Sequence, residues 1–265
     1  MSALADDLDL ALELAALADE VTLPRYRAAD LAVSTKPDLT PVTEADTAAE
    51  RAIRERLGSA RPDDGVLGEE FGDDAGRGGG RRWIVDPIDG TKNYVRGIPV
   101  WATLIALQDG DELTVGVVSA PALGRRWWAA RGLGGFVSDA ITGESRQLRV
   151  SAVNALADAQ VSLAGLDGWL GNGRREALIA LVRATWRSRG FGDFWAHMLV
   201  AEGAVDVAVD APGVSLWDVA APLVIVEEAG GRFSDLTGQR TATGGEALAS
   251  NGLLHDAALA IVGRH

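Results

Sequence analysis

Apolar residues near the start of the chain recur at intervals of three and four. Such spacing places one apolar face on a helix. It predicts an amphipathic helix over residues 4–22 that ends or kinks near Pro24. The recurring positions are Leu4, Leu8, Leu12, Ala15 and Ala18.

A second helix is predicted after a loop rich in proline and threonine, residues 34–46. Thr43 and Asp46 have the spacing of a helix capping box. The sequence that follows predicts a helix over residues 47–57.

Shorter apolar runs in the next part of the chain predict strands. A strand over 83–86 follows a glycine-rich segment, 72–82, which is typical of a mobile loop, and this strand is expected to stop at Pro87. The runs 101–107 and 113–120 flank a turn and predict a hairpin. An antiparallel meander is expected to continue through residues 125–131, 134–138 and 146–151.

The pattern changes near residue 158, after which predicted strands and helices alternate. The strands are 161–165, 205–210, 231–235 and 247–251, and the helices are 175–186, 194–203, 217–231 and 255–263. This order predicts a layered α+β fold. We expect an antiparallel sheet in an α+β half, residues 1–150, and a smaller α/β sheet in residues 151–265.

Composition excludes several classes of function. The 265 residues include 25 Lys plus Arg against 38 Asp plus Glu, a net charge of −13, which argues against nucleic-acid binding through a basic face. The absence of cysteine excludes disulfides, thiolate zinc sites and a cysteine nucleophile. An acidic N-terminus and the lack of a long apolar run predict a cytoplasmic protein without a membrane partner.

Candidate chemistry centres on the segment that follows the strand 83–86. Asp86 and Asp89 are three residues apart, and Pro87 and Gly90 constrain the turn between and after them. Such a turn can aim both carboxylates and the carbonyl of Ile88 at one point. These oxygen ligands suit Mg²⁺ or Mn²⁺ better than Zn²⁺. The amides of Gly90 and Thr91 have the arrangement expected of an anion nest.

Four further acids have ordinary structural explanations when each is taken alone. Glu69 and Glu70 form a pair of the kind usually found on a solvated surface. Asp46 and Asp218 each stand where an acid caps a helix N-terminus. No one of these residues identifies a site.

Taken together and in order, these segments resemble the inositol monophosphatase family. The matching segments are TEAD at 43–46, GEE at 68–70, DPIDGT at 86–91, and WD at 217–218 opening a run that ends in EAGG at 228–231. The resemblance implies an αβαβα sandwich of the sugar-phosphatase type. It also implies a homodimeric, Mg²⁺-dependent phosphomonoesterase that acts on a small-molecule phosphate ester.

By family position, the resemblance also assigns roles to residues. It places two or three Mg²⁺ ions, with Mn²⁺ as an alternative, on Glu69, Asp86, the Ile88 carbonyl, Asp89 and Asp218. It places the substrate phosphate on Gly90 and Thr91. Asp46, Glu70 and the Thr91 hydroxyl would orient the attacking water, which needs no phosphoenzyme.

The segment after this turn resembles the histidinol-phosphate phosphatase branch of the family. Asp193 follows Gly192, where inositol-specific members have a small hydroxyl residue, and a carboxylate there suits a cationic leaving group. Phe194 or Trp195 is expected to pack against the imidazole ring. Members of the family usually have an acid at the position of Ala211, seven residues before Asp218. The neighbouring Asp210 is a partial substitute for it. The full predicted substrate site comprises Glu69, Ile88, Asp89, Gly90, Thr91, Asn93, Arg189, Asp193 and Asp218.

The expected function is therefore hydrolysis of L-histidinol phosphate in histidine biosynthesis. The alternatives are a sister activity on inositol-1-phosphate, fructose-1,6-bisphosphate or a nucleotide 3′-phosphate, and a catalytically inactive regulatory member. The haloacid dehalogenase superfamily has the motif D-x-D-G-T, but Pro87 occupies the position of its nucleophile. Metal ligation is not expected of His197, His255 or His265.

Overall fold

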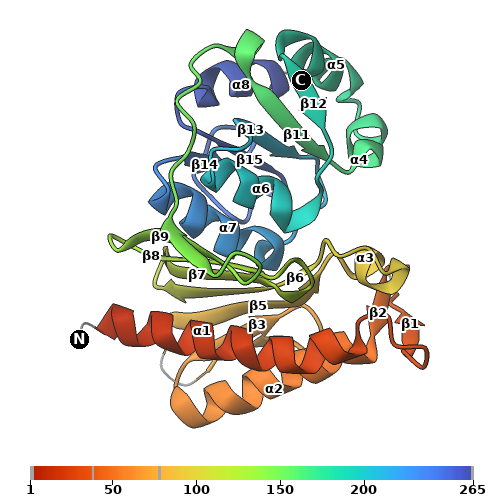
Figure 1. The fold of residues 1–265 in the computed structure, drawn as a ribbon, viewed down its shortest axis with the longest axis vertical. Coiled ribbons are helices and arrows are strands. Elements are labelled where there is room, and N and C mark those ends of the chain that lie inside the picture. Colours follow the sequence, from red (N-terminus) through yellow and green to blue (C-terminus); the bar gives the residue numbers. More distant parts are fainter. Residues whose placement is uncertain (1–2, 38, 77–78, 264–265) are drawn as a thin grey trace.

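The structure is a computed structural model that describes residues 3–37, 39–76 and 79–263. Its helices and sheets form five layers (Figure 1). Helices α1 (Ala3–Thr22) and α2 (Glu44–Ala60) cover one face of a large sheet. Helices α6 (Asp193–Ala201) and α7 (Leu216–Glu228) lie between this sheet and a smaller one. Helices α4 (Leu166–Gly171), α5 (Arg175–Ala184) and α8 (His255–Val262) form the outer layer beside the smaller sheet, at the opposite end from α1 and α2.

The large sheet contains eight strands within the described residues, in the order β10-β9-β8-β7-β6-β5-β3-β4. Neighbouring strands are antiparallel except β3 and β5, which are parallel. The strands are β3 (Gly65–Gly68), β4 (Gly72–Asp74), β5 (Arg81–Asp89), β6 (Ala102–Asp109), β7 (Glu112–Ala120), β8 (Arg125–Ala130), β9 (Gly134–Asp139) and β10 (Glu144–Gln147).

The smaller sheet has the order β12-β11-β13-β15-β14. Strands β12, β11 and β13 are parallel, whereas β15 pairs antiparallel with both β13 and β14. Its strands are β11 (Gln160–Ala164), β12 (Arg187–Arg189), β13 (Val207–Asp210), β14 (Arg232–Ser234) and β15 (Ala247–Ser250). A separate hairpin of β1 (Val33–Thr35) and β2 (Pro41–Thr43) lies at the end of α1.

Alternation along the strands divides the hydrophobic core between the layers. On β5, Trp83 and Val85 face the helices α1 and α2, whereas Ile84 faces α7. The cluster around α7 includes Val118 of the large sheet and Phe233 of the small one. A single central helical layer therefore joins the two sheets and fixes the position of residues at the N-terminus of α7.

This architecture confirms the predicted layered α+β fold with its larger N-terminal and smaller C-terminal sheet. The parallel pair β3–β5 adds to the expected antiparallel order. No helix among the described residues is both long enough and apolar enough to cross a membrane.

Some element boundaries differ from the prediction. The segment 72–82 is not only a loop, because β4 and the start of β5 lie within it; its residues 77–78 lie outside the described residues. Strand β5 also continues beyond Pro87 to Asp89. Proline is tolerated there because the pairing register between β5 and β6 shifts between Asp86 and Asp89.

Other segments were predicted as loops or were not assigned. Residues 34–46 contain most of β1, all of β2 and the start of α2, and residue 38 lies outside the described residues. Of the expected strand 146–151, only residues 146–147 belong to β10. Four further strands and α-helices were not predicted from the sequence: β3, α3 (Thr91–Arg96), α4 and β12.

Candidate active site and metal centre

The end of β5 presents Asp86 and Asp89 to the same point. Residues three apart on a regular strand face opposite sides of the sheet. Here the register against β6 shifts between Asp86, opposite Leu104, and Asp89, opposite Ala102. Such an irregularity redirects a side chain. The backbone between the two acids is held by the Thr103 hydroxyl, which donates to the Pro87 carbonyl at 2.8 Å.

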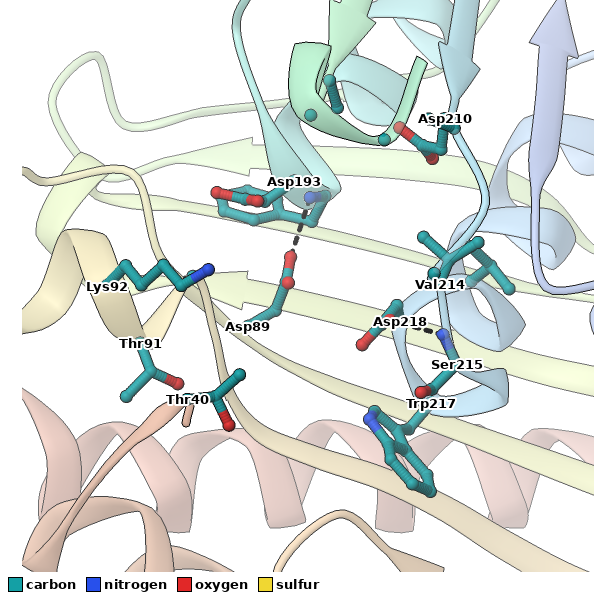
Figure 2. A pocket seen from close by; sticks show the side chains of 18 of the residues that line it. Thr40, Asp89, Thr91, Lys92, Asp193, Asp210, Val214, Ser215, Trp217 and Asp218 are labelled. Atoms are coloured by element: carbon teal, nitrogen blue, oxygen red, sulfur yellow. Dashed lines mark hydrogen bonds between the residues drawn. The ribbon is translucent and has the colours of Figure 1, made fainter. Parts of the chain in front are cut away.

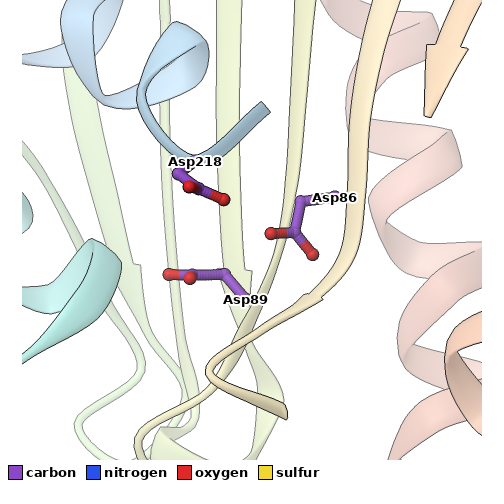
Figure 3. A group of neighbouring side chains, drawn as sticks. All are labelled: Asp86, Asp89 and Asp218. Carbon is purple, nitrogen blue, oxygen red and sulfur yellow. The ribbon is translucent and has the colours of Figure 1, made fainter. Parts of the chain in front are cut away.

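Helix α7 brings a third carboxylate, Asp218, to this point. The Ser215 amide donates to Asp218 Oδ2 at 2.7 Å, and the two residues form a capping box. One carboxylate oxygen from each of Asp86, Asp89 and Asp218 lies within 4.8 Å of the others. Figure 3 shows the three side chains converging from the strand and the helix. Capping and membership of this cluster are therefore compatible roles for Asp218.

The cluster is electrostatically strained without a cation. Burial and the nearby charges of Glu69, Asp89 and Asp218 raise the pKa of Asp86 well above its ordinary value. Asp86 is only 2% exposed, and its Oδ1 has no hydrogen-bond partner among the described residues. Burial, the largest effect, raises the pKa of Asp218 to about 7, and nearby acids including Glu69 act in the same direction.

These donors fit a hard divalent cation. An unpartnered buried carboxylate oxygen that faces two other carboxylates is costly, and a cation bound by oxygen ligands removes that cost. The group contains no histidine or cysteine ligand, which favours magnesium over zinc.

A second acidic group adjoins the cluster where β3 ends. Lys36 Nζ, from the turn between β1 and β2, lies 2.7 Å from Glu69 Oε1 and 2.7 Å from Glu70 Oε1. Burial raises the pKa of Glu70 to about 7, although the Lys36 hydrogen bond lowers it. Glu50 of α2 holds the turn by accepting hydrogen bonds from the amides of Glu70 at 2.7 Å and Phe71 at 3.2 Å.

Asp46 lies at the start of α2 and is fully buried. It caps the helix together with Thr43, as predicted. Its other oxygen, Oδ1, is 3.3 Å from the Thr91 hydroxyl, which also donates to the Ile88 carbonyl at 2.9 Å. Burial, the largest effect, raises the pKa of Asp46. The predicted water-orienting residues Asp46 and Thr91 are thus in contact, at the edge of the acidic cluster.

Gly90 makes the turn from β5 into α3. Its φ of 83° is in the left-handed region, and a Cβ there would lie 3.0 Å from the Val100 carbonyl oxygen and 3.3 Å from Asp193 Oδ2. Only glycine therefore combines this backbone conformation with so close an approach of the opposite wall.

These residues border a cavity of about 550 Å³ between the two sheets (Figure 2). Of the predicted site residues, those that line the cavity are Glu69, Asp89, Gly90, Thr91, Asn93, Asp193 and Asp218. Asp86 and Ile88 are buried behind the lining, and Asp46 and Glu70 are also absent from it. Arg189 is exposed on β12, where its guanidinium donates to the Ser188 carbonyl, and it does not line the cavity.

The opposite wall is held to the strand turn by direct contacts. The Phe194 amide donates to Asp89 Oδ2 at 2.7 Å, and Asn93 Nδ2 donates to Asp193 Oδ2 at 3.0 Å. The Phe194 ring packs in the core beside Trp127 although the residue lines the cavity. Trp195 is not among the lining residues.

Two lysines at the site were not singled out from the sequence. Lys92 lines the cavity, and Figure 2 shows its side chain extending toward Asp89. Lys92 could have been predicted as a site residue, because it directly follows the motif at 86–91. Lys36 had no such signal, because its partners lie more than 30 residues away and come together only in the fold.

Comparison with known proteins confirms the predicted resemblance. Residues 4–265 match the model of the inositol monophosphatase family. A histidinol-phosphatase of Mycobacterium tuberculosis is 56% identical over 96% of both chains. A histidinol-phosphatase of Streptomyces coelicolor is 54% identical over 95% of this chain and 94% of its own.

A solved structure has the same fold. The extragenic suppressor protein suhB from Bartonella henselae superposes with a TM-score of 0.87 and is 29% identical, covering 97% of this chain and 98% of that one.

Proposed function

Because the chain belongs to the inositol monophosphatase family, we propose that it is a magnesium-dependent phosphatase that hydrolyses L-histidinol phosphate to L-histidinol and phosphate. The reaction would serve histidine biosynthesis. The observation on which the proposal depends most is the three-carboxylate cluster at the edge of a cavity with two further carboxylates on its other wall. The named histidinol-phosphatases that are more than half identical to this chain support the choice of substrate.

The acidic cluster would hold the metal. The proposed ligands are Glu69, Asp86, the Ile88 carbonyl, Asp89 and Asp218, for two or three ions. When bound, magnesium supplies Lewis acidity, which neutralises phosphate charge and lowers the pKa of water.

The chain's own groups would place the nucleophile and the phosphate. Asp46, Glu70 and the Thr91 hydroxyl would exchange protons with a water molecule beside the cluster. The 3.3 Å contact between the Thr91 hydroxyl and Asp46 Oδ1 supports this assignment. The backbone at Gly90 and Thr91 lies open to the cavity, where a phosphate oxygen can accept from its amides.

Charge on the far wall would select the leaving group. Histidinol phosphate has an ammonium group on the carbon next to its ester carbon. Asp193 accepts a hydrogen bond from Asn93 and lies close to Gly90, and it would bind this ammonium group beside the phosphate. A neutral polyol would bring no positive charge to this carboxylate, which favours histidinol phosphate over inositol-1-phosphate.

Phosphate release from a panel of esters tests this proposal. The purified chain should hydrolyse L-histidinol phosphate with Mg²⁺ and lose the activity when EDTA replaces it. Inositol-1-phosphate, fructose-1,6-bisphosphate and a nucleotide 3′-phosphate should have lower kcat/KM values. Comparable turnover of inositol-1-phosphate, or none of histidinol phosphate, would overturn the substrate assignment. No turnover of any ester would favour an inactive member of the family.

We also propose that the enzyme is a homodimer and acts in the cytoplasm, as the family resemblance implies. Light scattering should give a mass near twice the 27.7 kDa of the chain. Expression in a histidine auxotroph that lacks histidinol-phosphatase should restore growth without histidine.

A further inference from the structure

The far wall of the cavity contains a second acidic pair, Asp193 and Asp210. In Figure 2 both lie above Asp89 and Asp218, and neither belongs to the three-carboxylate cluster. Burial, followed by the charge of Asp210, raises the pKa of Asp193, and the charge of Lys92 lowers it. Both carboxylates line the same cavity, so like charges face the same space. A cationic or hydrogen-donating group in that space would relieve the repulsion.

Asp210 is held by a buried histidine. It is the last residue of β13, opposite Ala164 of β11 and Ala247 of β15. His197 of α6 approaches it from the central layer, with Nε2 2.6 Å from Asp210 Oδ2. Because a carboxylate accepts, the Nε2 hydrogen is the donor. Both residues are almost fully buried, yet both line the cavity.

Burying the His197 imidazole costs free energy, because one of its two ring nitrogens has no hydrogen-bond partner among the described residues. That nitrogen is Nδ1, and the ring lies 5.6 Å from that of Phe233. An apolar side chain of similar size would avoid the unpartnered nitrogen. The favourable contact that remains for the imidazole is the one that orients the Asp210 carboxylate.

The two acids differ in their distance from the phosphate turn. Asp193 Oδ2 lies against Gly90 and Asn93, beside the proposed phosphate position. Asp210 is attached to the other sheet, next to the apolar lining residues Ala211 and Val214. In histidinol phosphate the ammonium is near the ester and the imidazole ring is farther from it, so the order of the acids matches the order of the cationic groups.

We propose that Asp210 accepts a hydrogen bond from the imidazole N–H of the substrate and that His197 is the positioning residue that holds Asp210 for it. Asp193 binds the ammonium group at the same time. This inference rests on the proposed function and extends it by assigning the ring end of the substrate. Asp210 thus supplies the acid that Ala211 lacks, from the neighbouring position.

Two ligands distinguish the contribution of the imidazole ring to binding from that of the ammonium group. L-Histidinol phosphate has both, whereas 2-aminoethyl phosphate has the ester and the ammonium without the ring. KM and kcat are measured for each, with 2-aminoethyl phosphate used as a competitive inhibitor if its turnover is slow. Asp210→Asn should raise KM for histidinol phosphate about tenfold or more, the range expected for loss of a charge-assisted hydrogen bond. Binding of 2-aminoethyl phosphate should change less than about twofold.

The role of His197 is tested by two substitutions. His197→Leu removes the donor and should raise KM for histidinol phosphate with little change in kcat. His197→Gln retains an N–H donor and should recover most of the loss. His255→Gln is the control, because His255 is also buried but bonds Ser234 and Ser250 in another part of the molecule. It should alter thermal stability without altering the ratio of the two affinities.

The possible failures are distinguishable. If the unaltered enzyme does not hydrolyse histidinol phosphate, the proposed function is wrong. If it does, but Asp210→Asn weakens both ligands equally or neither, the ring contact is wrong. Equal KM values for His197→Leu and His197→Gln would assign His197 a structural role only. Asp210→Asn is nearly isosteric, so its outcome decides the ring contact even if His197→Leu does not fold.

Discussion

The carboxylate of Asp89 has three roles in the structure. It belongs to the acidic cluster, lines the cavity and accepts the Phe194 amide, which ties β5 to α6. Burial, followed by the charges of Asp193 and Asp218, raises its pKa well above the ordinary value. A cation bound at this position would therefore favour the ionised form of Asp89.

The substitution Asp89→Asn removes the negative charge of this side chain and keeps its size and shape nearly unchanged. The amide oxygen can still accept from Phe194, but one negative charge is lost. We expect phosphatase activity to fall by at least about 100-fold, the upper range for loss of a group that only supports a metal ligand. The unfolding temperature without metal should be unchanged or higher, because repulsion within the cluster decreases. Steady-state phosphate release and thermal unfolding in EDTA measure the two effects.

Asp109→Asn is the matched control for this change. Asp109 ends β6, is exposed, and lies 3.4 Å from Arg81 on the surface. The same change in charge and volume there should leave activity as it was. Retained activity in Asp89→Asn would contradict the proposed metal site.

Individual residues of the site could be predicted where the chemistry is local in the sequence. Asp86, Asp89 and Gly90 occur within one turn, whose constraints are visible in the residue types. The contacts of Lys36 with Glu69 and of His197 with Asp210 could not be predicted. Each depends on how separate elements pack, and neither leaves a periodic or spacing signal in the chain.

At the scale of elements, helix α2 supports the site from behind. Glu50 is fully buried, bonds Arg54 one turn along the helix, and accepts the two amides of the turn that presents Glu69 and Glu70. Gly68 is required next to it, because a Cβ there would lie 2.0 Å from Glu50 Oε1. The position of the turn is therefore set by a buried residue that does not itself line the cavity.

Glu50→Gln should weaken Mg²⁺ binding, because Glu50 anchors the turn that presents Glu69 and Glu70. The amide has only one acceptor oxygen for two backbone N–H groups and Arg54, so the turn loses part of its anchoring. We expect the Mg²⁺ concentration for half-maximal activity to rise about 10- to 100-fold, as for the loss of other groups that orient metal ligands. Mg²⁺ titration of activity measures the shift.

Glu13→Gln provides the comparison for this prediction. Glu13 of α1 also pairs with an α2 arginine, Arg56, but on the exposed surface. Its Mg²⁺ requirement should match that of the unaltered chain. An unchanged requirement in Glu50→Gln would show that α2 does not position the turn.

Most long elements could be predicted because their periodicity extends over many residues. The hairpin β6–β7 and helices α1, α5 and α8 follow directly from apolar spacing. The three-residue strands β1 and β2 could not be distinguished from a proline-rich loop. Parallel pairing of β3 with β5 was equally inaccessible, since a four-residue apolar run does not specify its partner or direction.

At the scale of the whole molecule, the net charge of −13 is partly concentrated at one place. The carboxylates that line a single cavity are Glu69, Asp89, Asp193, Asp210 and Asp218, and Asp86 is buried behind them. Within the described residues, Lys92 is the one lysine or arginine that lines this cavity. Without a bound cation, the negative charge of these carboxylates would repel the proposed substrate, which carries a negatively charged phosphate. Binding of the proposed divalent cations would overcome this repulsion, because such cations reverse the local potential.

Stability should consequently depend on pH and on Mg²⁺ together. Burial raises the pKa values of Asp218 and Glu70 to about 7, from ordinary values of 3.8 and 4.5. A raised acid pKa means that the folded chain binds more protons than the unfolded chain between the two values. Without metal, the free energy of unfolding should therefore fall as pH rises from about 4 to about 7. Each group contributes up to about 1.4 kcal/mol per pH unit.

Mg²⁺ should reverse this loss only where the carboxylates are ionised. At about 100 times its dissociation constant, a ligand of the folded state adds about 2.7 kcal/mol. We expect Mg²⁺ to raise the unfolding temperature clearly at pH 8 and little at pH 5, compared with NaCl at the same ionic strength, which accounts for screening. Asp218→Asn should show a weaker pH dependence in EDTA and a smaller Mg²⁺ effect. An equal Mg²⁺ shift at both pH values would mean that the ion stabilises the chain at another place, and the acidic cluster would lose its assignment.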